Sequence, residues 1–129
     1  MEGALHKEDG LDRDCPRSSS SMKLASDNLL HAEGEHRKEE VFEDLLCRPG
    51  VRIERIVSRG HTTPPDKPYV QDWDEWVLVL AGSARLSLEG LGERTLVAGE
   101  HLLIPARVPH LVTYTADVTI WLAVHIGES

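Results

Sequence analysis

The chain has 129 residues and a formal net charge of −8, with 40% hydrophobic and 28% charged residues. That length suits one domain, and the hydrophobic fraction is too high for a chain that is disordered throughout. The acidic balance disfavours nucleic-acid binding, and no apolar run approaches the roughly 20 residues that a membrane helix needs. The first residues contain no apolar signal core, and Cys15 and Cys47 are too few for a disulfide scaffold. We therefore expect reduced thiols in a cytoplasmic protein with no nucleic-acid or membrane partner.

Residues 1–40 are predicted to form a flexible acidic arm. The first 44 residues contain 12 acidic and 6 basic side chains, so most of the negative charge lies here. Four serines at 18–21 follow a charged stretch, and such a composition cannot bury enough apolar surface to offset its chain entropy. A passive tail is the favoured interpretation of the arm, and an arm that recruits a partner is the alternative. Residues 35–40 could instead form a short helix or a solvated edge.

From Val41 onward the sequence is typical of short β-strands separated by turns. The strand candidates are residues 41–47, 51–58, 76–80, 83–89, 94–98, 101–104, 111–114 and 118–126. Turn signals such as Arg48-Pro49-Gly50 separate them, and no helical period is present. Within 51–58 the apolar alternation slips at Arg55, which predicts a bulge. The pattern predicts an all-β domain, a closed barrel or a sandwich, over residues 41–127.

The segment after the proline-rich loop places a carboxylate on an apolar face. Strand parity puts Glu75, Val77 and Val79 on one face. A buried carboxylate beside valines needs a metal, histidine or arginine partner. The opposite, outward face would suit a homodimer interface; its residues are Trp76, Leu78 and Leu80.

Two spacings carry a family resemblance. Glu75 is followed after six residues by Gly82, and Gly99 is followed by Pro105 and then His110. These segments resemble the two motifs of the cupin superfamily, Gly-x5-His-x-His-x3–4-Glu-x6-Gly and Gly-x5-Pro-x-Gly-x2-His-x3-Asn. The second match departs from the motif at two positions, Arg107 for glycine and Tyr114 for asparagine. The segments 69–77 and 121–125 are similar to small single-domain bacterial cupins.

The resemblance implies a cupin-like jelly-roll β-barrel over 41–127. It also implies one divalent metal, Fe, Mn, Ni, Cu or Zn, because most cupins hold such an ion with three histidines and the glutamate. Carried over residue by residue, only Glu75 and His110 match. Gln71 and Tyr69 stand where the two histidines of the first motif belong. A neutral amide oxygen is a weak ligand, and a phenol binds well only once it is deprotonated.

Two further histidines are candidates for the missing ligands. His61 opens the loop that would cross the mouth of the barrel, and His125 shares a strand face with Trp121 and Ala123. The alternative for each is a histidine satisfied by one hydrogen bond. At Arg107 the glycine of the motif implies a positive φ, and the guanidinium could also clamp an anionic substrate.

The predicted function is that of a small cupin that binds one divalent metal in the barrel. Such a protein would act on or bind a small oxygenated molecule, and the sequence does not choose between catalysis and binding. The alternative is a metal-free module that binds a small ligand or works through a homodimer.

Overall fold

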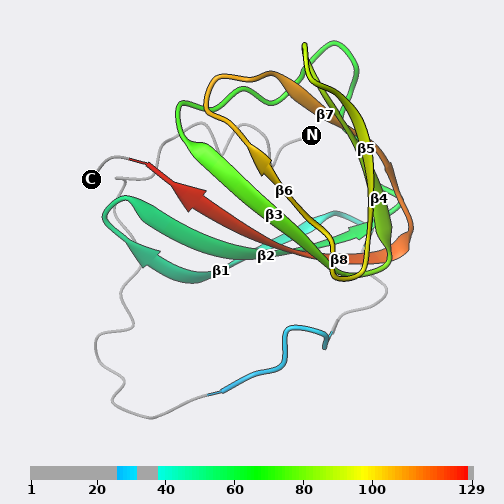
Figure 1. Ribbon diagram of the computed structural model, residues 1–129. Helices are drawn as coiled ribbons and strands as arrows, with labels where there is room; N and C mark the ends of the chain where they lie inside the picture. Colours follow the sequence, from blue (N-terminus) through cyan, green and yellow to red (C-terminus); the bar gives the residue numbers. More distant parts are fainter. Residues whose placement is uncertain (1–25, 32–37, 128–129) are drawn as a thin grey trace.

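The computed structural model describes residues 26–31 and 38–127, which form strands and connecting turns (Figure 1). Most of the predicted arm lies outside the described residues. Its described part contacts the domain, because the guanidinium of Arg55 donates hydrogen bonds to the carbonyls of Leu29 at 3.0 Å and His31 at 2.6 Å. The same guanidinium pairs with Glu43 at 2.9 Å.

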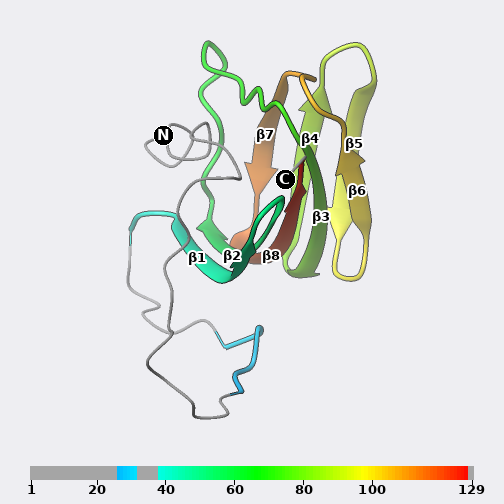
Figure 2. The same ribbon diagram turned by 90° about the vertical axis from the view of Figure 1, so that its left-hand side faces the viewer.

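Eight strands make up the described domain, and each lies close to a predicted one. They are β1 (Val41–Arg48), β2 (Val51–Arg59), β3 (Asp74–Ala81), β4 (Ser83–Leu88), β5 (Gly92–Val97), β6 (His101–Ile104), β7 (His110–Thr115) and β8 (Asp117–Ile126). They pair antiparallel in two sheets, with the orders β1-β2-β8-β3-β6 and β5-β4-β7 (Figures 1 and 2). The predicted all-β jelly roll is confirmed.

The core lies between the two sheets and takes residues from both. Its buried members are Ile56, Val77, Val79, Ala84, Leu86, Leu88, Leu96, Ile104, Trp121 and Ala123. The predicted parity of β3 is confirmed, because Glu75 is as fully buried as Val77 and Val79. The valines and the carboxylate therefore share the inward face, and the strand carries a charged group into the interior.

The bulge predicted at Arg55 is wrong. β2 pairs with β8 without interruption from Val51 to Ser58, and the irregularity nearby lies on β1, between Asp44 and Leu46. The apolar pattern slips because Glu54 faces inward on the same side as Ile56 and Ser58 and is 4% exposed. A polar residue in the interior, and not an extra residue, thus interrupts the alternation.

Cys47 is disulfide-bonded, so the expected free thiol is wrong there, and Cys15 lies outside the described residues. No helix within the described part of the chain is long and apolar enough to cross a membrane. The homodimer and the cytoplasmic location stay predictions. Trp76 lies on the outer face as expected, where its ring packs 5.4 Å from that of His101.

The turn between β3 and β4 packs closely against β8. Gly82 has a φ of 84°, and a Cβ at this position would collide with the carbonyl of Val118. Gly90 has a similar φ of 79° and open space around it. We predict that Gly90→Ala destabilises the fold by about 1 kcal/mol through backbone strain alone. Gly82→Ala should cost about 1–3 kcal/mol more because of the added overlap. Urea unfolding measures both, and equal losses would contradict the packing described here.

Candidate functional site

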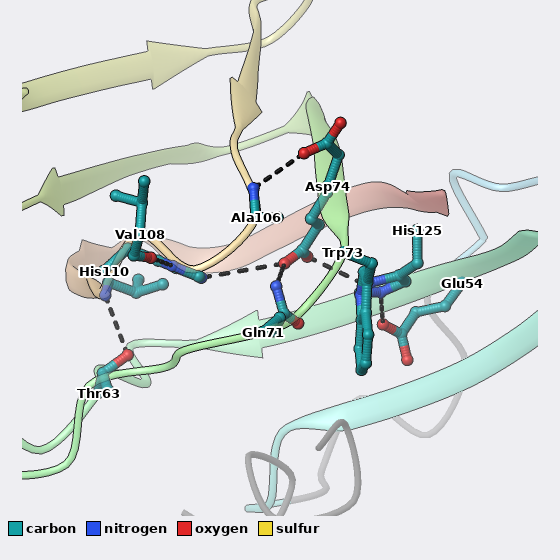
Figure 3. A network of polar contacts seen from close by, with 11 residues as sticks. Glu54, Thr63, Gln71, Trp73, Asp74, Ala106, Val108, His110 and His125 are labelled. Atoms are coloured by element: carbon teal, nitrogen blue, oxygen red, sulfur yellow. Dashed lines mark hydrogen bonds and ion pairs between the residues drawn. The ribbon is translucent and has the colours of Figure 1, made fainter. Parts of the chain in front are cut away.

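Four of the five predicted site residues converge at one end of the sandwich, and Figure 3 labels three of them, Gln71, His110 and His125. Gln71 comes from the loop before β3, Glu75 from the start of β3, His110 from the start of β7, and His125 from the end of β8. Each is at most 4% exposed. The strand register explains the convergence, because Glu75 lies opposite His125 across the β3–β8 pair. The loop is held against β7 by paired backbone hydrogen bonds between Tyr69 and His110.

The carboxylate of Glu75 lies at the centre of the group. Its Oε1 accepts a hydrogen bond from Nε2 of Gln71 at 2.8 Å and lies 3.9 Å from Nε2 of His110. Its other oxygen, Oε2, lies 3.9 Å from Nε2 of His125. Glu75 therefore faces two imidazoles at a distance beyond a direct hydrogen bond.

The side chain of Gln71 is only partly satisfied. Its backbone carbonyl accepts a hydrogen bond from the N–H of Arg107 at 2.6 Å, which fixes the loop. Its amide nitrogen donates to Glu75, but its Oε1 is buried and has no hydrogen-bond partner. A buried acceptor without a donor costs about 1–3 kcal/mol. This oxygen is therefore the point in the group that a ligand could satisfy.

His110 has a defined orientation. Its Nδ1 lies 2.9 Å from the carbonyl of Val108, so this nitrogen carries a proton and donates it. In the neutral ring, Nε2 then has no proton and presents its lone pair toward Glu75. The ring of Tyr69 stacks on the imidazole with centroids 5.5 Å apart. Tyr69, which stands where the family motif has a histidine, thus contributes a ring face to the site.

His125 is completely buried, and both of its ring nitrogens are used (Figure 3). The indole N–H of Trp73 donates to Nδ1 at 2.8 Å, and Nε2 lies 2.8 Å from Oε1 of Glu54. Because an indole can only donate, Nδ1 must be the acceptor. The proton of the neutral ring is therefore on Nε2 and is donated to Glu54.

Sequence reasoning identifies neither Glu54 nor Trp73 as a site residue. The signal for Glu54 is the phase slip of β2, because an inward-facing polar residue interrupts the apolar alternation. For Trp73 the sequence carries no comparable signal, because it lies in a loop without a periodic pattern.

The structure does not bring His61 to this group. Its Nδ1 accepts the backbone N–H of Arg59 at 2.9 Å, and its Nε2 lies 2.7 Å from the carbonyl of Lys38. Its own carbonyl accepts a hydrogen bond from Thr115, at the end of β7 away from His110. Backbone groups therefore occupy both ring nitrogens of His61.

The arrangement does not fit the divalent metal that the family resemblance implied. The Nε2 of His125 carries the proton that it donates to Glu54, and its Nδ1 accepts from Trp73, so this ring offers no lone pair to a metal. Across residues 26–31 and 38–127, no three His, Cys, Asp or Glu side chains are grouped so that they could hold a metal ion. Glu75 and His110 are the two potential ligands that remain, beside the neutral oxygen of Gln71.

Arg107 lies at the turn between β6 and β7 with a φ of 66°, as the replaced glycine implied. Its side chain is 75% exposed, and its Nε lies 3.9 Å from Oδ1 of Asp72. We predict that Arg107→Gly stabilises the fold by about 0.5–1 kcal/mol relative to Arg107→Ala, because only glycine removes the strain of this conformation. Chemical denaturation compares the two variants, and a more stable alanine variant would contradict this explanation.

Comparisons with known proteins agree with the architecture. A candidate mannose-6-phosphate isomerase from Ralstonia eutropha JMP134 is 38% identical, with a TM-score of 0.76 and coverage of 82% of this chain and 100% of that one. An RmlC-like cupin from Desulfovibrio desulfuricans is 20% identical, with a TM-score of 0.62 and coverage of 80% and 97%. Another RmlC-like cupin, from Methanocaldococcus jannaschii, is 22% identical, with a TM-score of 0.60 and coverage of 72% of this chain and 84% of that one. No protein-family model and no curated protein sequence matches the chain.

The 38% identity extends over most of the chain, and the two more distant structures share its fold. The two antiparallel sheets, the buried Glu75 and His110, and the turn at Arg107 lie where the two sequence motifs predict them. The chain belongs to the cupin superfamily and has its RmlC-like, double-stranded β-helix fold.

Proposed function

We propose that this cupin binds a small, hydroxyl-rich molecule at the group formed by Gln71, Glu75 and His110, and that it needs no resident metal to do so. The observation that supports the proposal is the buried Oε1 of Gln71, which has no hydrogen-bond partner. Native proteins satisfy nearly all such groups, so an exception inside a cluster of polar side chains indicates a place for a ligand atom.

The chemistry of the neighbouring groups indicates the class of ligand. Gln71 offers an amide oxygen, Glu75 a carboxylate, and His110 in its neutral form the lone pair of Nε2. All three are acceptors, so a ligand must bring donors, and sugar or polyol hydroxyls do this. An anionic group would instead approach the two buried carboxylates of Glu54 and Glu75, which disfavour it.

The name of the 38% identical relative indicates a sugar phosphate and is consistent with this class. The sugar hydroxyls would meet the acceptors of the site. A phosphate would have to stay outside the buried group, and Arg107 supplies an exposed cation beside the loop of Gln71. D-Mannose and mannose 6-phosphate are therefore suitable first probes, and they separate the contribution of the hydroxyls from that of the phosphate.

The alternative, a barrel that requires Fe, Mn, Ni, Cu or Zn, has less support. It would need a third strong ligand beside Glu75 and His110, and the candidates for it, His61 and His125, are held by other hydrogen bonds. Metal analysis of the purified protein distinguishes the metal-free binding site from the metal-dependent one.

We expect isothermal titration calorimetry to show that at least one of the two sugars binds to chelator-treated protein. Gln71→Met should weaken that binding about tenfold, because a hydrogen bond to a buried acceptor contributes about 1–1.5 kcal/mol. His110→Ala should also weaken it. His101→Ala is the matched control, because His101 is exposed on the outer face.

Two results would overturn the proposal. The first is that neither D-mannose nor mannose 6-phosphate binds to the folded, chelator-treated protein. The second is a transition metal present at one equivalent whose removal abolishes binding. Circular dichroism spectra of the variants confirm that each has kept its fold.

A further inference from the structure

We propose that Trp73 and Glu54 withhold His125 from divalent cations and thereby keep the interior of this barrel a hydrogen-bonding site. Trp73 and Glu54 are positioning residues in this proposal, because they act through His125. The proposal concerns metal selectivity of the site described above, and it rests on the proposed function only for the ligand that the site binds in place of a metal.

The two hydrogen bonds of the His125 ring have defined directions. Trp73 donates to Nδ1 of His125 at 2.8 Å, and this contact uses the lone pair of Nδ1. The Nε2–H donates to Oε1 of Glu54 at 2.8 Å, so Nε2 has no lone pair to offer. A metal ion needs an unprotonated ring nitrogen, and His125 presents none.

A change from this Nε2–H tautomer of His125 to the Nδ1–H tautomer would be costly. To bind a metal through Nε2, the proton would have to move to Nδ1, where it would face the indole N–H of Trp73. Two donors would then oppose each other in a position that is completely buried. At the same time, Oε1 of Glu54 would lose the Nε2–H of His125 as its donor, and Glu54 is only 4% exposed. Both partners therefore oppose the same change.

His125 lies next to Glu75, which in turn lies next to His110. Its Nε2 lies 3.9 Å from Oε2 of Glu75, and Oε1 of Glu75 lies 3.9 Å from Nε2 of His110. Release of His125 would bring a second imidazole to the carboxylate and produce a set of two histidines and one glutamate. The hydrogen bonds of Trp73 and Glu54 to His125 thus prevent this set of metal ligands from forming.

The test on the unaltered protein is a long-range ¹H–¹⁵N correlation spectrum of the histidine rings, recorded during a titration with zinc chloride. We expect His125 to show a protonated Nε2 and an unprotonated Nδ1 throughout the titration. A His125 ring that is protonated on Nδ1, or whose Nε2 signal moves to that of a zinc-bound nitrogen, would overturn the proposal. This measurement does not depend on the folding of any variant.

The test by substitution uses the double variant Trp73→Phe/Glu54→Ala. It should bind zinc at least tenfold more tightly than the parent protein in isothermal titration calorimetry, and the additional change His125→Ala should abolish the gain. Trp76→Phe/Glu43→Ala, which changes the same residue types on exposed or outward positions, should leave zinc affinity unchanged. A folded Trp73→Phe/Glu54→Ala variant without a gain would overturn the proposal. If that variant does not fold, the spectrum of the parent protein decides.

The outcome is separate from that of the sugar-binding test. A protein that binds neither sugar but keeps the Nε2–H tautomer of His125 in zinc would contradict the proposed function and support the withholding of His125. A protein that binds a sugar and coordinates zinc through His125 would support the proposed function and contradict the withholding of His125.

Discussion

Burial of two carboxylates at one end of a small β sandwich is the constraint on which the site depends. Each charge would be very costly there without partners. Glu54 is matched by the N–H of His125, and Glu75 receives the amide N–H of Gln71. The partners come from β8 and from the loop before β3, so the polar group links strands and loop at this end.

The loop before β3 supplies side chains that bond to the buried polar residues of the strands. It carries both Gln71 and Trp73, and the backbone pairing of Tyr69 with His110 holds it along β7. Asp74 accepts the backbone N–H of Ala106 at 2.8 Å and joins the start of β3 to the turn before β7. These contacts hold the acceptors of Gln71, Glu75 and His110 in one place before any ligand arrives, which lowers the entropic cost of binding.

The sequence indicated the strands and the inward parity of β3 because alternation and turn residues are local signals. It also indicated the positive φ of Arg107, through the glycine that the residue replaces. It missed Glu54 because period-two reasoning assigns polar residues to the solvent face, and here the polar residue faces the interior. His61 became a candidate from its place in the loop alone, and only the tertiary structure shows that it lies away from His110. The arm at 1–40 lies mostly outside the described residues.

Membership of a family does not determine the chemistry of a site. This chain keeps the cupin framework and the Glu75–His110 pair, but it has Gln71 and Tyr69 at motif positions of histidine, and it holds His125 between Trp73 and Glu54. The result is a group rich in hydrogen-bond acceptors, with one buried oxygen left unsatisfied.

The most direct measurement is a crystal structure of the protein grown in excess zinc, with data collected at the zinc absorption edge. The account predicts no anomalous peak bound jointly by Glu75, His110 and His125, and a Glu54–His125 contact that remains near 2.8 Å. A zinc ion held by both imidazoles and the carboxylate of Glu75 would contradict it.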